Sequence, residues 1–307
     1  MAKATREAYG EALAELIQEN ENVFVLDADL TKSTKTVLAK KVCPERHYNM
    51  GIAEGNMMGV AAGLAASGKT VYASSFAMFA AGRAYEQVRN SIGYPHLNVK
   101  VCATHAGLSD GEDGASHQCI EDLGLMRGIP GMYVFQPCDA TETKSIIKGI
   151  ANIDGPCYVR LGRSSVEDVF DDSYVFEPGK GKVIQKGEKV ALVATGMMVQ
   201  ETMKAAKNMV IQPTIVNFSS IKPIDKGLLL ELAKTHDVII TCEEHNIVNG
   251  LYGAVCECLA PYNLCKIVPI GIMDTFGESG KNKDLLEKYN LSSKSIYEKF
   301  CEIYQGL

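Results

Sequence analysis

The stretch HYNMGIAEGNMMGVAAGLAASG, residues 47–68, holds one carboxylate, Glu54, in an otherwise almost uncharged run of small and apolar residues. A charge in such surroundings is costly unless it is paired or performs chemistry. The part from Glu54 to Ser67 predicts a helix that is rich enough in Ala and Gly to pack closely on a neighbour. Two interpretations of Glu54 stay open at this point. It is either a first-turn carboxylate favoured by the helix dipole or an acid that belongs to a functional site.

The bulk composition describes a globular protein. The chain has 307 residues, which is enough for two domains, and 46% of them are hydrophobic against 22% charged. The net charge is −6 and no basic run occurs. We therefore expect neither nucleic acid nor an anionic membrane as a partner. An anionic substrate would have to be held by a few local cations.

The N-terminus and the cysteines indicate the compartment. The segment MAKATREAYGEALAEL has no apolar core of a signal peptide. No stretch of the chain reaches the ~18 apolar residues of a membrane span. The ten cysteines are scattered without a CxxC motif, so neither a zinc site nor a disulfide framework is indicated. We expect free, buried thiols in a cytoplasmic protein.

Predicted strands and helices alternate through the first half of the chain. This pattern is typical of a parallel sheet with helices on both faces. Thr5 is a plausible cap for the first helix. The expected strands are 23–26, 70–73, 99–104, 132–136 and 157–161, and the expected helices are 5–19, 54–67, 78–91, 119–126 and 141–150.

The segment 164–188 interrupts the alternation with acidic residues, Pro178 and three glycines, and it is the best linker candidate. A second alternation follows it. The chain is thus expected to form two α/β domains, residues 1–163 and 189–307, joined by that linker. In the second domain the expected strands are 190–195, 214–217, 238–242 and 266–270, and the expected helices are 199–208, 226–235, 250–259 and a C-terminal helical region.

Polar or aromatic groups follow several of the predicted strands. In open α/β sheets, ligands bind beyond the carboxyl ends of strands, so these groups are candidates for one shared site. The P-loop and GxGxxG motifs are both absent, which disfavours an ordinary nucleotide-binding module. The candidate groups are Asp29, Phe76 with Phe79, the loop from His105 to His117, and Arg160 with Arg163.

The loop THAGLSDGEDGASHQ, residues 104–118, has two histidines that bracket three carboxylates. A histidine on such a loop suits general acid/base chemistry or hydroxyl binding, because its ordinary pKa lies near neutrality. The oxygen spacing does not match an EF-hand. A surface turn built by Asp and Gly explains the same residues, and both interpretations stay open. The loop is too polar to be expected in the core.

Six segments, taken together and in order, resemble the transketolase family. The resemblance covers nearly the whole chain, but only the second half of a full-length member: its pyrimidine-binding domain and its C-terminal domain. The diphosphate-binding domain with its GDG…N metal motif is missing. The segments are ATR (4–6), DADLTKS (27–33), MGIAEGNM (50–57), SSFAMF (74–79), THAGLSDGEDGASHQ (104–118) and GPCYVRLGR (155–163).

The resemblance implies the C-terminal subunit of a split transketolase. Such a subunit moves a two-carbon ketol unit between sugar phosphates with the cofactor thiamine diphosphate. It would need a separate N-terminal subunit to hold Mg²⁺ and the diphosphate, in an assembly expected to be a heterotetramer. No metal ligand is expected in this chain.

The resemblance also implies roles at the cofactor. Glu54 would activate the cofactor through a hydrogen bond to its pyrimidine ring nitrogen, and burial would favour the protonated acid. Phe79 and Phe76 would pack on the pyrimidine. Asp29 would lie near the cofactor and the substrate channel.

Further residues are implied at the substrate. His117 would bind the terminal hydroxyl of the ketose and help proton transfer, and Asp113 would recognise the 2-hydroxyl of the acceptor aldose. His105, the other candidate catalytic histidine, would lie further out, near the phosphate. Guanidinium groups offer bidentate bonds to phosphate, and the expected clamp consists of Arg6, Ser33 and Arg163.

One departure from the family leaves alternatives open. The tyrosine often found three residues beyond the second phenylalanine is Gly82 here, and RAYEQ (83–87) resembles deoxyxylulose-phosphate synthases. The alternatives are such a synthase, a 2-oxoacid dehydrogenase beta-like subunit, and a non-catalytic regulatory subunit. EEHNIVNGLYG (243–253) and MDTFGESG (273–280) also resemble family segments, and His245 is expected to be structural or at an interface.

Overall fold

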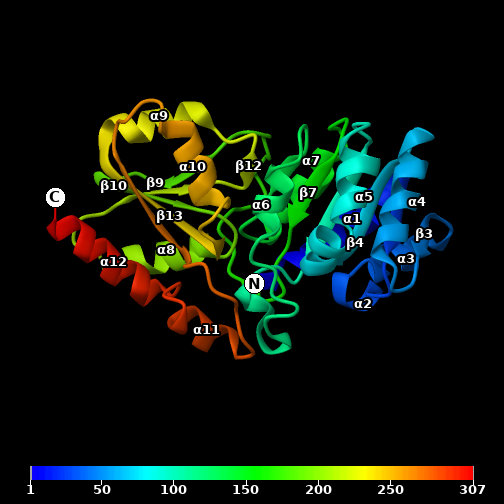
Figure 1. Ribbon diagram of the computed structural model, residues 1–307, viewed down its shortest axis with the longest axis horizontal. Coiled ribbons are helices and arrows are strands. Elements are labelled where there is room, and N and C mark those ends of the chain that lie inside the picture. The colour runs from blue at the N-terminus through cyan, green and yellow to red at the C-terminus, as the bar shows by residue number, and fades with distance from the viewer. Residues whose placement is uncertain (1, 307) are drawn as a thin grey trace.

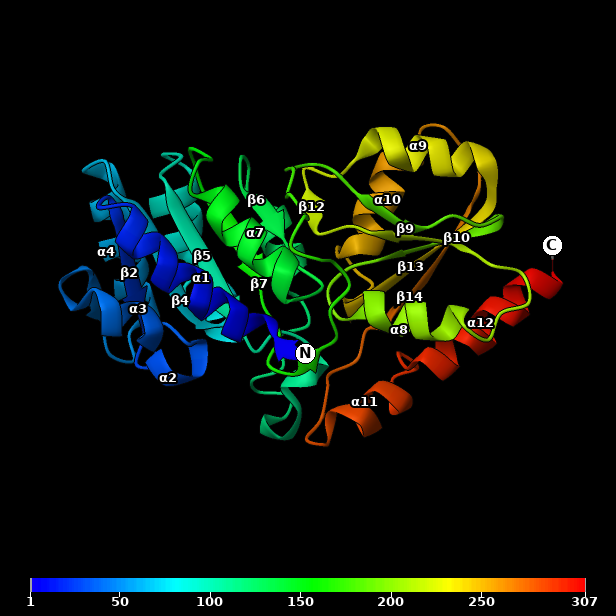
Figure 2. The same cartoon turned by 180° about the vertical axis from the view of Figure 1, so that it is seen from behind.

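The computed structural model describes residues 2–306 and shows two lobes side by side, each built around one β-sheet (Figures 1 and 2). The N-terminal half of the chain forms one lobe and most of the C-terminal half forms the other. Within residues 2–306, no helix is both long and apolar enough to cross a membrane. The predicted class, two α/β domains with mainly parallel sheets, is confirmed.

The first lobe is organised on a seven-stranded sheet in the order β12-β6-β7-β5-β4-β2-β3. Every neighbouring pair is parallel except β12 with β6. The carboxyl ends of the parallel strands therefore meet at one edge of the sheet. The strands are β2 (Val23–Asp27), β3 (His47–Asn49), β4 (Thr70–Phe76), β5 (Val99–Thr104), β6 (Tyr133–Phe135), β7 (Cys157–Arg160) and β12 (Ser220–Lys222).

Helices cover both faces of this sheet because successive strand residues point to opposite faces. Val25 and Tyr72 pack in the core under α1 and α7, whereas their neighbours Leu26 and Val71 pack in the core under α4 and α6. The helices are α1 (Thr5–Glu19), α2 (Thr31–Thr34), α3 (Val37–Val42), α4 (Glu54–Ala66), α6 (Asp122–Arg127) and α7 (Ala140–Ile150), with a short 3₁₀ turn at Pro44–Arg46.

The helix predicted over 78–91 is not a regular α-helix. It consists of a π-helix over Met78–Arg83, a single α-turn, α5 (Tyr85–Gln87), and a second π-helix over Val88–Gly93. A π-turn holds one residue more than an α-turn, so a 3.6-residue periodicity does not predict it. π-Helical turns occur frequently at functional sites, and this one lies beside the candidate site.

The second lobe has a five-stranded sheet in the order β14-β13-β10-β11-β9, in which only β9 is antiparallel. Its strands are β9 (Lys182–Gln185), β10 (Lys189–Ala194), β11 (Thr214–Asn217), β13 (His236–Asn246) and β14 (Lys266–Ile272). Its helices are α8 (Met198–Ala206), α9 (Lys226–Thr235), α10 (Leu251–Leu259), α11 (Asn282–Lys288) and α12 (Ser293–Gln305).

The two halves of the chain are interlocked more than the sequence predicts. The segment 164–188, expected to be a linker, contributes β9 to the second sheet and β8 (Ser165–Val166), which pairs with β1 (Lys3–Ala4). In the other direction, β12 from the second half completes the edge of the first sheet. None of these three pairings follows from a local pattern, because each joins segments that are separated in sequence.

The cap predicted at Thr5 is wrong. The N-cap of α1 is Ala4, and Thr5 is the first helical residue. The hydroxyl of Thr5 instead accepts a 2.8 Å hydrogen bond from the backbone N–H of Gly162. Thr5 thus ties the start of the chain to the segment that carries Arg163.

Buried Asp139 anchors the segment after β7. Its Oδ1 accepts a hydrogen bond from the backbone N–H of Glu142 and caps α7, while Oδ2 accepts from the N–H groups of Val169 and Phe170, each at 2.7 Å. One side chain thus satisfies three backbone donors from two separate segments.

We expect Asp139→Ala to lower the free energy of unfolding by about 2–4 kcal/mol, because it removes a buried helix cap and leaves two further, partly buried backbone donors without their acceptor. Ser292→Ala is the matched control, since Ser292 caps only α12 through the N–H of Ser295. That change should cost about 1 kcal/mol. Urea unfolding measures both, and equal losses in the two variants would contradict the anchoring role of Asp139.

Candidate functional site

Four neighbouring strands deliver the candidate residues to one edge of the first sheet. β7, β5, β4 and β2 lie next to one another in that order. Phe76 ends β4, His105 follows β5, and Arg163 lies three residues beyond the end of β7. The parallel topology therefore gathers these segments where α/β proteins bind ligands.

Two phenylalanines and two histidines form a continuous row, which we call the aromatic–histidine row. The ring of Phe79 lies 5.3 Å from that of His117, which lies 6.2 Å from Phe76, and Phe76 stacks on His105 at 3.8 Å. Phe76 and Phe79 are themselves 6.0 Å apart. The loop histidines and the phenylalanines after β4 thus belong to one site.

Glu54 lies at one end of this row as the first residue of α4, and it is 1% exposed. Its Oε1 accepts a hydrogen bond from Ser75 Oγ at 3.3 Å, and its Oε2 accepts one from Arg83 Nη1 at 2.8 Å. The Arg83 guanidinium also lies 4.4 Å from the centre of the Phe79 ring. Glu54 therefore has both properties left open by the sequence: it begins a helix, and it is a buried acid paired within the site.

Arg6 lies at the other end of the row. Its Nη1 donates to the backbone oxygen of Ser33 at 2.9 Å and lies 3.3 Å from His105 Nε2. An arginine can only donate, so Nε2 is the acceptor and the His105 proton is on Nδ1, which lies 2.8 Å from Thr104 Oγ1. Ser33 contributes its carbonyl rather than its hydroxyl.

His105 is held in its neutral form. Burial, followed by the charges of Arg6 and Arg163 and a smaller effect of His117, lowers the pKa of His105 to about 3. With both ring nitrogens engaged, His105 orients Arg6 and does not supply a proton near neutral pH.

Arg163 and Asp110 lie beside the Arg6 end. Arg163 Nη1 donates to the backbone oxygen of Asp110. Asp110 is fully buried, and neither carboxylate oxygen has a hydrogen-bond partner within residues 2–306. Burial and the charge of Asp113 raise the pKa of Asp110 to about 7. Sequence reasoning gave Asp110 no role, and its only signal was its position in the histidine loop.

The expectation that the loop is too polar for the core is wrong for its first half. Residues 105–110 are all buried, whereas Glu112 and Asp113 are exposed. A 3₁₀ segment over Leu108–Asp113, kinked at Gly111, runs from the buried half into the exposed half. The loop is therefore not a surface turn at its start, and Asp113 lies at its solvent-exposed rim.

Asp29 lies apart from the aromatic–histidine row. It is exposed, and its Oδ1 accepts a 3.1 Å hydrogen bond from Asn49 Nδ2. Within the part of the chain that the structure describes, no hydrogen bond or ring contact joins Asp29 to that row. The buried acid at this strand end is Asp27, which binds Leu30 N–H and the hydroxyls of Thr34 and Thr36.

At position 82, where the family often has a tyrosine and this chain has glycine, the neighbouring Met78 fills the space of a side chain. A Cβ built on Gly82 would overlap Cε of Met78. The thioether end of Met78 thus occupies the space that a side chain at position 82 would enter. Because Met78 is flexible, this space is adaptable.

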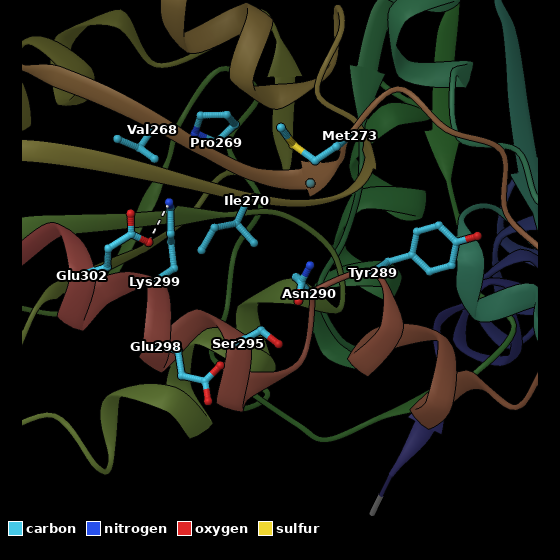
Figure 3. Close-up of a pocket in the computed structure, with 11 residues that line it drawn as sticks. Val268, Pro269, Ile270, Met273, Tyr289, Asn290, Ser295, Glu298, Lys299 and Glu302 are labelled. Atoms are coloured by element: carbon cyan, nitrogen blue, oxygen red, sulfur yellow. Dashed lines mark hydrogen bonds and ion pairs between the residues drawn. The ribbon is translucent and has the colours of Figure 1, made fainter.

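A separate groove of about 460 Å³ lies in the second lobe, between β14 and α12 (Figure 3). Val268, Ile270 and Met273 line one side. Lys299 and Glu302 line the other, and they form an ion pair with 2.9 Å between Lys299 Nζ and Glu302 Oε2. It contains none of the candidate site residues, so it is distinct from the site described above.

Fold and site together define a two-domain α/β protein with a buried acid, a row of aromatic and imidazole rings, and arginines at one sheet edge. Residues 1–168 match the family model of the transketolase pyrimidine-binding domain, and residues 179–296 match that of the transketolase C-terminal domain. The chain belongs to the transketolase family.

Relatives of similar length agree with this placement. A protein named as a transketolase C-terminal section in Methanocaldococcus jannaschii is 48% identical, and the match covers 98% of this chain and 96% of that protein. A solved structure titled a split gene transketolase, inactive beta4 tetramer, is 50% identical with a TM-score of 0.89 and 97% of each chain covered. A 6-deoxy-6-sulfo-D-fructose transketolase subunit of a Clostridium species is 34% identical over 97% of this chain and 94% of that protein.

We expect the imidazole of His105 to stay neutral from pH 8 down to about pH 4, because burial and two guanidiniums hold its pKa near 3. Nitrogen-15 NMR of the histidine rings measures this, and His105 should show the Nδ1-protonated tautomer. Arg6→Gln removes one of the charges and should raise the pKa. A wild-type transition of His105 between pH 6 and 7 would contradict the geometry.

We expect Glu54 and Arg83 to be energetically coupled. Arg83→Met should cost about 1–3 kcal/mol, because it leaves a buried carboxylate without its charged partner, although Arg83 itself is half exposed. In a Glu54→Gln background the same change should cost less than about 0.5 kcal/mol. The exposed pair Lys299–Glu302 is the control, with a coupling of about 0–0.5 kcal/mol. A double-mutant cycle that gives both pairs the same coupling would contradict this expectation.

Proposed function

We propose that this chain is the C-terminal subunit of a two-chain transketolase, which transfers a two-carbon ketol unit between sugar phosphates with thiamine diphosphate. The supporting observation is the unbroken series of contacts from Glu54 through Arg83 and the aromatic–histidine row to Arg6. Such a series has an acid at one end, cations at the other and two imidazoles between them.

The acid end fits the pyrimidine of the proposed cofactor. Glu54 binds Arg83, whose guanidinium lies against the Phe79 ring, so a buried carboxylate stands beside an aromatic surface. Glu54 would hold the pyrimidine ring nitrogen, and Phe76 and Phe79 would pack on the ring. When bound, thiamine diphosphate would supply the carbon nucleophile that takes up the two-carbon unit.

The middle of the row offers a proton carrier. His117 is half-buried, and its Nδ1 lies 2.9 Å from Ser116 Oγ. Within residues 2–306 no hydrogen bond engages its Nε2. His117 is therefore the imidazole proposed to bind a ketose hydroxyl and to move its proton, whereas His105 has both nitrogens engaged.

The cation end fits an anionic group on the sugar. Arg163 binds the backbone oxygen of Asp110 and Arg6 binds His105, so both guanidiniums lie against the buried half of the histidine loop. Ser33 and His105 engage Nη1 of Arg6, and Nε of Arg6, which has no partner within residues 2–306, remains as a donor for a phosphate. Exposed Asp113 is proposed to meet a hydroxyl of the acceptor aldose, and Ser33 to fix Arg6 through its carbonyl.

A partner chain is part of the proposal. The matched domains are the pyrimidine-binding and C-terminal ones, so a separate N-terminal subunit is proposed to hold Mg²⁺ and the cofactor diphosphate. The assembly is proposed to be a heterotetramer. All ten cysteines are free thiols in the structure, which supports a cytoplasmic location.

Mixing the chain with its N-terminal partner, thiamine diphosphate and Mg²⁺ should convert xylulose 5-phosphate and ribose 5-phosphate to glyceraldehyde 3-phosphate. Glu54→Gln should lower kcat by roughly 10³-fold or more, because cofactor activation loses its acid. Coupled detection of glyceraldehyde 3-phosphate measures the rate. The sulfonated ketose named for the Clostridium relative serves as an alternative donor.

Pyruvate as donor is the control for a synthase or a 2-oxoacid dehydrogenase. Turnover of pyruvate and not of the ketoses would contradict transketolase activity. A Glu54→Gln assembly that retains the wild-type rate would instead favour a regulatory subunit.

A further inference from the structure

Glu244 reaches from the second lobe into the histidine loop of the first. It lies near the end of β13, is 3% exposed, and its carboxylate accepts hydrogen bonds from both the backbone N–H and the hydroxyl of Ser109, the latter at 3.1 Å. Ser109 lies between His105 and His117. The side chain of the C-terminal domain thus binds the backbone of the loop that carries both histidines.

The contact leaves no room for a side chain at the neighbouring position 107. Gly107 has φ +84°, a conformation that favours glycine. A Cβ at this position would lie 2.5 Å from the carboxyl carbon of Glu244. Any side chain at position 107 would therefore push the carboxylate and the loop apart.

Surrounding groups hold Glu244 and Ser109 in place. Fully buried Arg160 donates from Nη2 to the backbone oxygens of Glu244 and Cys119, and from Nε to Asp122. Ser164 Oγ donates to the backbone oxygen of Ser109 at 3.0 Å. Arg160 and Ser164, both from the first lobe, thus bind the backbone on either side of the contact between Glu244 and Ser109.

A second contact from the C-terminal lobe lies at the far side of the loop. Gln118 Nε2 donates to the backbone oxygens of Gly111 and Glu278, and Ser279 Oγ donates to that of Glu112 at 2.6 Å. These bonds involve exposed loop atoms or side chains of the loop itself. Glu244 differs from them in bringing a buried carboxylate from the other lobe.

The adjacent Glu243 has the same chemistry and a different target. It is also buried on β13, and its two oxygens accept the N–H groups of Leu251 and Tyr252, at the start of α10. Burial raises the pKa of each carboxylate to about 7. Both residues are thus buried carboxyl groups on β13, but only Glu244 contacts the histidine loop.

We propose that Glu244 is a positioning residue, which holds the His105–His117 loop in the geometry that the transfer reaction needs. This inference rests on the proposed function. Through Glu244 the C-terminal domain would contribute to the reaction without contacting the substrate. Since Ser109 is eight residues before His117, a shift of its backbone changes where His117 lies.

Glu244→Gln and the matched control Glu243→Gln test the proposal in the reconstituted assembly. For Glu244→Gln we expect kcat to fall by roughly 10- to 100-fold, the effect of about 1 Å of misplacement, with KM for the ketose changed less than kcat. Amide hydrogen exchange in residues 107–114 should be faster. Glu243→Gln should keep kcat within about twofold and speed exchange at the start of α10 instead.

Ser109→Ala is the second variant, should Glu244→Gln fail to assemble. It removes only the hydroxyl donor and should lower kcat by a smaller factor, with little further loss when combined with Glu244→Gln. Equal loss of kcat in the two glutamate variants, or wild-type loop exchange in Glu244→Gln, would overturn the proposal. If the wild-type assembly transfers no ketol unit, the proposed function fails, while loop exchange still tests the positioning role of Glu244.

Discussion

The buried ion pair of Arg160 with Asp122 is the interaction on which the site depends. Both side chains are almost fully buried, and Tyr158 also donates a hydrogen bond to Asp122, at 2.6 Å. Breaking such a pair leaves an uncompensated buried charge, which costs several kcal/mol (about 3–5). Arg160 also donates to the backbone oxygens of Cys119 in the first lobe and Glu244 in the second. One guanidinium at the end of β7 therefore connects the histidine loop to the other lobe.

Much of the fold follows from local sequence patterns. β5, β11, α1 and α9 have the predicted bounds, because each is a compact apolar or amphipathic segment that ends in a polar residue. β9 and β12 were missed because their pairing partners lie in distant segments. The π-helices after β4 were missed because periodicity predicts only regular turns. What escaped prediction is non-local pairing or irregular backbone, not the order of the elements.

The site divides in the same way. Glu54, Phe76, Phe79 and the two loop histidines could be proposed from the sequence because they stand in compact, ordered segments. Arg83, Asp110 and Glu244 could not, because their importance comes from what they meet after folding. Asp29 shows the converse: its position after a strand suggests a site, but its side chain pairs with Asn49 at the exposed rim.

The exchange of β12 into the first sheet bears on how the two lobes can be handled. A fragment ending before Ser220 would leave the outer edge of β6 bare, with unpaired backbone groups beside the buried side chains of Val134 and Phe135. Bare strand edges are templates for edge-to-edge aggregation. We therefore expect a fragment that holds the first lobe alone to associate through this bare strand, which β12 covers in the whole chain.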